Sequence, residues 1–175
     1  MELKKAIEDR RSIRKFKTDA VSDNLIEELL NSAILAPSPK NRQPWKVSIL
    51  KDEKKNKIAD MMLDWREKNN GKMTMKMTAN VIKEAPILLL VYREGKGEEK
   101  DHEMVSIGAF IEHICLAATD MNLGSLWIGY VCYIEQEINE YLHISNSELV
   151  SAVSIGYPNE YPSKRPRREL KDILI

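Results

Sequence analysis

The chain has 175 residues, of which 43% are hydrophobic and 31% are charged, and its 27 basic residues balance its 27 acidic ones. This length and composition predict one globular domain over residues 1–175 with a substantial core. Zero net charge argues against a broad nucleic-acid-binding surface, and no run of about 18 uncharged apolar residues is present to span a membrane. Cys115 and Cys132 are too few for a disulfide framework, and the first residues lack the apolar stretch of a signal peptide, so we expect a cytoplasmic protein.

The first half of the chain alternates between helical and extended patterns. Ser22 is a suitable N-cap for a helix whose apolar residues recur at helical spacing, and Pro37 and Pro39 end that helix. The expected elements are a helix over residues 3–9, a helix that follows Ser22, a strand over residues 45–50 and a helix over residues 53–67.

The second half contains the most apolar elements. Residues 87–92 form a continuous apolar run, which predicts a strand buried on both faces. The helix expected over residues 103–121 is apolar almost all round, so a second copy of the chain should cover part of it, as in an intertwined homodimer. A central helix in a monomer is the alternative. A strand over residues 125–131, a helix over 134–142, a strand over 149–155 and an irregular basic tail complete an α/β or α+β layered sheet.

Six of the nine arginines fall in two clusters near opposite ends of the chain: Arg10, Arg11, Arg14, Arg165, Arg167 and Arg168. A guanidinium group stays charged and donates two parallel hydrogen bonds, which suits a phosphate dianion, and Ser12 adds a hydroxyl. If folding brings the clusters together, they form one anion pocket. The alternative is that the first cluster is a solvated helix end.

Motifs for other chemistries are absent from the sequence. It contains no glycine-rich dinucleotide fingerprint, no P-loop and no nucleophile elbow, and its three histidines have no metal-ligand spacing. No catalytic acid, base, nucleophile or metal site stands out. This is compatible with a bound cofactor as the reactive group.

Four segments in order then carry a resemblance over nearly the whole chain: residues 10–16 (RRSIRKF), 36–45 (APSPKNRQPW), 123–129 (LGSLWIG) and 165–167 (RPR). In this order and spacing the chain resembles the nitroreductase family of FMN-dependent oxidoreductases. The resemblance implies an α+β fold with a central, mostly antiparallel sheet flanked by helices. It also implies an intertwined homodimer with a long buried interface helix and an FMN site between the subunits.

The resemblance also assigns FMN-binding residues. The phosphate side would be held by Arg10, Arg11, Ser12, Arg165 and Arg167. The flavin ring would be met by Arg14 at its pyrimidine end and by the strand segment Trp127, Ile128 and Gly129 near N5 and O4. A loop from the partner subunit would supply Pro37, Ser38, Pro39 and Asn41. Ile128 stands where some family members carry an acidic residue, so only its backbone could act there.

The function implied is hydride transfer from NAD(P)H to FMN, then reduction of a nitroaromatic, quinone or similar electron-poor small molecule in a ping-pong cycle. Flavin N5 would be the reactive atom, so no catalytic side chain is expected. A specialised flavin reaction, such as reductive dehalogenation or a biosynthetic oxidation, is an alternative that a charge clamp from Arg66, Lys72 and Lys76 would favour. An arginine-rich nucleic-acid-binding module is the alternative from another class, and the 6% aromatic content argues against it.

Methionines are concentrated in residues 61–77, which contain Met61, Met62, Met73, Met75 and Met77. Methionine adapts to ligands of varied shape, so one hypothesis is a flexible cover over the substrate face of the flavin, near Trp65. Ordinary core packing is the equal alternative.

Overall fold

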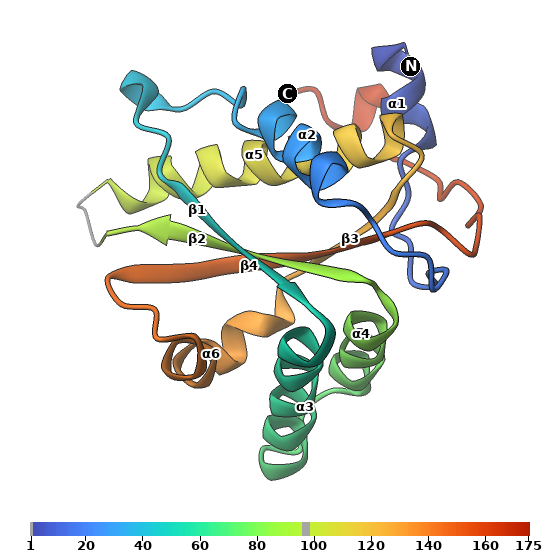
Figure 1. Ribbon diagram of the computed structural model, residues 1–175. Helices are drawn as coiled ribbons and strands as arrows, with labels where there is room; N and C mark the ends of the chain where they lie inside the picture. The colour runs from blue at the N-terminus through green and yellow to red at the C-terminus, as the bar shows by residue number, and fades with distance from the viewer. Residues whose placement is uncertain (1, 96–98) are drawn as a thin grey trace.

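A computed structural model describes residues 2–95 and 99–175 of the chain, and its centre is a four-stranded sheet (Figure 1). The strands are β1 (Trp45–Lys51), β2 (Ile87–Glu94), β3 (Gly124–Ile128) and β4 (Ser147–Gly156). They lie in the order β1-β2-β4-β3, and each neighbouring pair is antiparallel. The expected α+β class and antiparallel sheet are therefore confirmed.

Helices cover both faces of this sheet. Above it in Figure 1 lie α1 (Leu3–Asp9), α2 (Asp23–Ala33) and α5 (Lys100–Asp120). Below it lie α3 (Asp52–Lys68), α4 (Met73–Glu84) and α6 (Glu135–Leu142). Short 3₁₀ turns occur at η1 (Pro39–Asn41), η2 (Tyr130–Ile134) and η3 (Leu170–Asp172). Among the described residues, no helix is long and apolar enough to cross a membrane.

Strand β2 explains why the molecule has two cores. Successive side chains of a strand point to opposite faces, so Leu88 and Leu90 join the core with α3, α4 and α6, whereas Leu89 and Val91 join the core with α2 and α5. All residues from 87 to 93 are buried. The continuous apolar run is therefore a strand covered on both faces, as predicted.

Most predicted elements are confirmed, and α2 begins as expected, with the Ser22 hydroxyl accepting a hydrogen bond of 3.3 Å from the Leu25 amide. One prediction was wrong, and one helix was not predicted. The strand expected to reach residue 131 ends at Ile128, after which the chain turns into η2. Helix α4 was not predicted, although its buried residues Met75, Ala79 and Ile82 recur at helical spacing.

Helix α5 packs chiefly against α2 and the sheet. Its inner residues, among them Ile107, Phe110 and Ile114, pack in the core that α2 and the sheet share. On its other side Val105 is 76% exposed and Leu116 is half-buried. A second copy covering this outer side remains a prediction.

Candidate functional site

The segment after α1 is attached to the far edge of the sheet and to the C-terminal tail. The Ile13 amide donates a hydrogen bond of 2.9 Å to the Ser125 carbonyl of β3. The Lys17 amide donates one of 2.8 Å to the Tyr157 carbonyl, and the Asn159 amide donates one of 2.9 Å to the Lys15 carbonyl. Because these contacts lie on both sides of residue 14, the first arginine cluster is held beside the start of the tail that carries the second.

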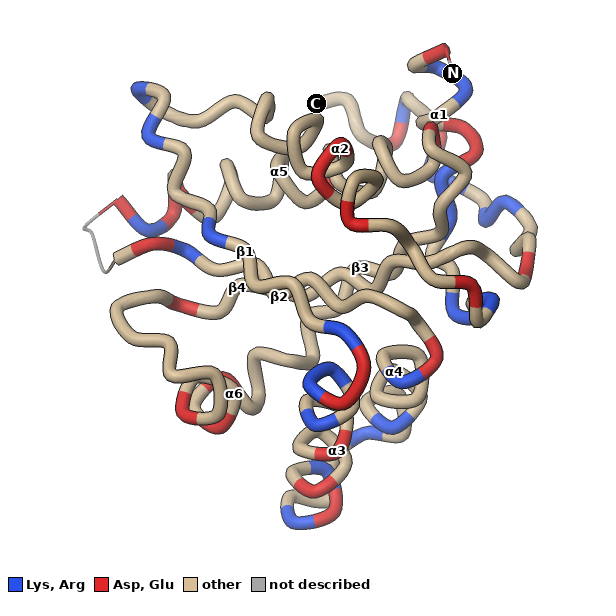
Figure 2. Tube along the Cα trace, in the orientation of Figure 1, with Lys and Arg blue, Asp and Glu red and all other residues tan. Residues whose placement is uncertain are grey.

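The two arginine clusters consequently line one hollow of about 470 Å³, called here the arginine hollow. The predicted site residues that line it are Arg10, Arg11, Ser12, Arg14, Arg165 and Arg167. Figure 2 shows the two basic segments next to each other at the right of the view, although more than 150 residues separate them in sequence. The convergence of the chain ends on one cationic hollow is thus a feature of the fold.

The contacts of the first cluster orient its guanidinium groups and leave one buried donor unpaired. Arg11 donates from Nη1 to the Glu8 carbonyl at 2.7 Å and to the Arg10 carbonyl at 2.8 Å, at the end of α1. Its buried Nε has no hydrogen-bond partner among the residues that the structure describes. Arg10 is oriented by Glu112 of α5, at 3.6 Å from Nε to Oε1. A buried donor without a partner is costly.

A second hollow of about 590 Å³, called here the Gly129 hollow, adjoins the first through Arg14, which lines both. Trp127, Ile128 and Gly129 line it on the sheet side. Glu160 also lines it and accepts a hydrogen bond of 2.6 Å from the Arg14 amide, so the tail holds Arg14 in place. The arrangement is an elongated site, with guanidinium groups at one end and strand backbone at the other.

The three residues on the sheet side present different groups. A Cβ at Gly129 would meet no atom within 4 Å, so the space in front of its backbone is open. Trp127 is 44% exposed and is therefore not a core aromatic, in contrast to Trp45, which stacks on Phe110 with ring centroids 4.9 Å apart. Ile128 buries its side chain, and its carbonyl oxygen accepts a hydrogen bond of 2.8 Å from Ser151.

Helix α4 forms the opposite wall of the Gly129 hollow, through residues that include Thr74, Met77 and Val81. Thr74 and Tyr130 hydroxyl oxygens are 2.7 Å apart, so a hydrogen bond ties this wall to the turn after Gly129. Residues 61–77 therefore span the end of α3, a short connection and the start of α4, with Met62 and Met75 in the core. Only Met77 of this methionine group lines the hollow, among the residues described.

The loop residues Pro37, Ser38, Pro39 and Asn41 lie elsewhere. In the described part of the chain none of them lines either hollow. The turn η1, which contains Pro39 and Asn41, contacts α5, and Arg42, which follows it, pairs with Glu99 and Glu103 at the start of that helix. Helix α1 lies toward the other end of α5 (Figure 1). One chain therefore brings together nine of the thirteen predicted site residues and leaves these four apart.

Sequence reasoning missed Glu160, Thr74 and Tyr130. Each acts through a contact with a residue distant in the chain: Glu160 with Arg14, and Thr74 with Tyr130. The helical spacing of the buried residues of α4 was the one signal that could have placed Thr74 on a wall.

Comparisons with known proteins identify the family of this chain. A sequence profile of the nitroreductase family matches residues 7–157. A protein of Archaeoglobus fulgidus with the provisional name NADH dehydrogenase/NAD(P)H nitroreductase is 32% identical over 164 residues, which cover 89% of this chain and 85% of that protein.

Solved structures share the fold over the full chain. A BluB-like flavoprotein from Clostridium difficile 630 has a TM-score of 0.86 at 25% identity, covering 100% of this chain and 98% of its own. A provisionally assigned nitroreductase from Desulfovibrio desulfuricans, solved in complex with FMN, has a TM-score of 0.84 at 23% identity, covering 100% and 96%. The profile match spans most of the sequence, and the chain belongs to the nitroreductase family.

Proposed function

We propose that this protein is an FMN-dependent oxidoreductase with two half-reactions. It takes a hydride from NAD(P)H and then passes electrons to a nitroaromatic, a quinone or a similar electron-poor small molecule. The observation that carries the proposal is the pair of adjoining hollows that share Arg14. The FMN in the Desulfovibrio desulfuricans structure and the NAD(P)H in the name of the Archaeoglobus fulgidus relative support it.

The residues present fit FMN, which joins a phosphate dianion to a flat ring through a flexible chain. Arg10, Arg165 and Arg167 supply charged donors around the arginine hollow, and the unpartnered Nε of Arg11 adds one more. The open space in front of Gly129 suits a flat ring laid against strand backbone. When bound, FMN supplies the atom that accepts and donates the hydride.

The chain would bind and orient rather than act as acid or base. Trp127 offers a partly exposed aromatic face, and Arg14 places a positive charge between the two hollows. A cation there favours whichever form of the bound ring carries negative charge. Hydride transfer depends chiefly on the placement of the reacting atoms, which is why the site needs no titrating side chain.

A homodimer is part of the proposal, with α1, α2, α5 and the tail as its interface. Large apolar side chains are exposed on this layer of the molecule: Leu3, Ile7, Leu35, Val105, Leu170, Ile173 and Leu174. A second copy covering them would remove this surface from water. In such a dimer, the loop residues Pro39 and Asn41 would contact the flavin of the partner subunit.

The general reductase is favoured over a specialised flavin reaction. Among the described residues, none of Arg66, Lys72 and Lys76 lines the Gly129 hollow, so the charge clamp considered for a dedicated substrate does not form there. The zero net charge and the 6% aromatic content disfavour the nucleic-acid-binding alternative.

The proposal is tested by FMN titration of the purified apoprotein, followed by anaerobic mixing of the yellow protein with NADH or NADPH. We expect either nucleotide to bleach the colour and a quinone or nitroaromatic to restore it. Arg167→Ala should weaken FMN binding about tenfold, because a charged donor to phosphate is lost. Arg168→Ala is the matched control, since Arg168 donates to the Asp172 carbonyl and does not line the hollow in the described structure. A protein that fails to bind FMN overturns the proposal.

A further inference from the structure

The loop before β1 is strained at three of four consecutive positions. Lys40, Asn41 and Gln43 have φ angles of 54°, 53° and 50°, in the left-handed region. This region is rare for residues other than glycine, because the Cβ atom approaches the carbonyl oxygen. Such a segment persists only where its surroundings hold it, and strain of this kind is concentrated at functional sites.

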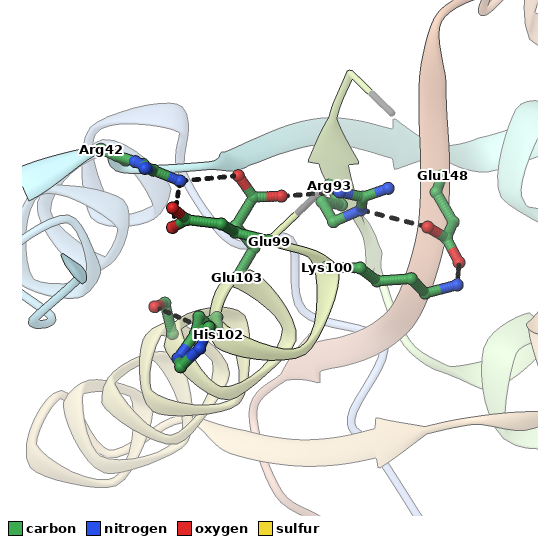
Figure 3. Close-up of polar contacts among 8 residues, drawn as sticks. Arg42, Arg93, Glu99, Lys100, His102, Glu103 and Glu148 are labelled. Atoms are coloured by element: carbon green, nitrogen blue, oxygen red, sulfur yellow. Dashed lines mark hydrogen bonds and ion pairs between the residues drawn. The ribbon is translucent and has the colours of Figure 1, made fainter. Parts of the chain in front are cut away.

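Two sets of contacts hold this loop. Inside it, the Ser38 hydroxyl accepts a hydrogen bond of 3.0 Å from the Gln43 amide. Outside it, the guanidinium of Arg42 forms an ion pair with Glu99, just before α5, and lies 3.9 Å from the carboxylate of Glu103, in the first turn of α5. Figure 3 shows Arg42 reaching both carboxylates from the loop.

The ion pairs continue from α5 into the sheet. Glu103 accepts a hydrogen bond of 2.6 Å from Arg93 of β2, whose side chain is only 4% exposed. Arg93 also donates to Glu148 of β4 at 3.1 Å, and Lys100 binds the other oxygen of that carboxylate (Figure 3). The hydrogen bond that Arg93 donates to Glu103 raises the pKa of Arg93, so the buried guanidinium stays charged. Alternating charges thus connect the strained loop to strands β2 and β4 of the sheet.

We propose that Arg42 is a positioning residue for the cofactor site of a second copy of this chain. Its ion pairs with Glu99 and Glu103 hold the loop in the conformation that presents Pro39 and Asn41, both exposed, to the partner's FMN. The inference rests on the proposed function, in which FMN lies between two subunits. Arg42 itself need not touch the cofactor.

The competing view is that Arg42 belongs to an ordinary surface ion pair. Exposed pairs contribute little to stability, and removing one should leave a distant cofactor site unaffected. The chain offers a matched control in Lys46 of β1, which lies 3.2 Å from Glu94, with both side chains more than half exposed. Lys46→Met removes a neighbouring pair that, in the described part of the chain, forms no ion pair with residues 38–43.

The first experiment compares the FMN dissociation constants of four folded proteins: wild type, Arg42→Met, Arg42→Lys and Lys46→Met. We expect about fivefold weaker FMN binding for Arg42→Met and no change for Lys46→Met. Arg42→Lys should recover part of the affinity, because lysine keeps the positive charge but lacks the planar guanidinium group. The midpoint of thermal unfolding of the apoprotein should be similar for all four. Equal FMN affinity for Arg42→Met and wild type overturns the inference.

The second experiment asks whether Arg42 acts across the dimer. An Arg42→Met subunit is paired with an Arg10→Ala/Arg167→Ala subunit, and the mixed dimer is isolated with two different affinity tags. If the loop acts on the partner's site, one FMN should bind per mixed dimer with wild-type affinity, because one site then has an intact hollow and an intact loop. A single site with the weakened affinity of Arg42→Met shows action within one subunit and overturns the inference.

The outcomes separate the inference from the proposed function. Wild-type protein that binds no FMN overturns both. Wild-type protein that binds FMN, with Arg42→Met unchanged, overturns the inference alone. If Arg42→Met does not fold, Glu99→Gln removes the same ion pair at an exposed carboxylate, and unchanged FMN affinity in that variant overturns the inference.

Discussion

The amide of Ile13 donates a hydrogen bond of 2.9 Å to the carbonyl of Ser125, and the Ile13 side chain packs against the backbone of Gly124. A Cβ at position 124 would lie 2.9 Å from both Cγ atoms of Ile13. The absence of a side chain at Gly124 therefore allows the N-terminal segment to lie against β3. The position of Arg10, Arg11 and Arg14 depends on this close approach.

Gly124→Ala is expected to lower the free energy of unfolding by about 1–3 kcal/mol, because the added methyl group forces Ile13 away from β3. It should also weaken FMN binding, since the first arginine cluster moves with that segment. Urea denaturation and FMN titration measure the two effects. The double variant with Ile13→Ala should cost less than the sum of the single changes, as expected for residues in contact. Strict additivity would contradict the account.

The role of residues 61–77 as a substrate wall can be tested with two methionines of α4. Met77 and Met73 are 57% and 60% exposed, yet of the two only Met77 lines the Gly129 hollow. Met77→Ala should change the KM for a bulky electron acceptor about two- to fivefold, the range for losing part of an apolar side chain, whereas Met73→Ala should leave it unchanged. Steady-state kinetics with a series of quinones make the measurement. Equal changes in KM from both substitutions would contradict the assignment of Met77 to the wall of the substrate site.

Trp127 should report cofactor binding through its fluorescence. Its exposed indole lines the Gly129 hollow, so FMN bound there should quench it strongly. We expect Trp127→Phe to remove more of the quenching seen on FMN titration than Trp65→Phe does. Trp65 is the control because, among the described residues, it does not line that hollow. It packs instead against Tyr133, with ring centroids 5.1 Å apart. Similar losses of quenching from the two variants would show that the flavin ring binds outside the Gly129 hollow.

Acid should weaken the ion pairs that connect β4 to α5. The hydrogen bond from Lys100, followed by that from Arg93, lowers the pKa of Glu148 below its ordinary value of 4.5. A carboxyl group with a lowered folded pKa stabilises the protein above its unfolded pKa, and this contribution is lost as pH falls through the folded pKa. The unfolding free energies of wild type and Glu148→Gln should differ most near neutral pH, and this difference should decrease below about pH 4.

Urea denaturation between about pH 3 and pH 7 provides the measurement for Glu148. Glu137→Gln is the control, at an exposed position of α6 for which the described structure shows no ion pair. A difference between wild type and Glu148→Gln that stays constant down to the lowest pH would show that the carboxylate does not contribute through its charge.

Local patterns in the sequence were enough for most elements. The uninterrupted apolar run at residues 87–92 predicts a strand buried on both faces, and Ser22 marks the start of α2, because both signals involve neighbouring residues only. Helix α4 was missed because its methionines suggested an adaptable surface, although Met75 and Ile82 proved to be core residues. The end of β3 was misplaced because apolar residues continue into η2.

The sequence by itself determined the chemistry that is available: two groups of arginines, a glycine beside an aromatic residue, and no titrating catalytic group. The tertiary structure alone decided which of these groups meet. Arg14 lies between the hollows because Glu160 binds its amide across 146 positions of the chain, and Arg42 is held by carboxylates at the start of α5. Contacts of this kind depend on how the sheet and its helices pack, and packing brings together residues that no local spacing relates.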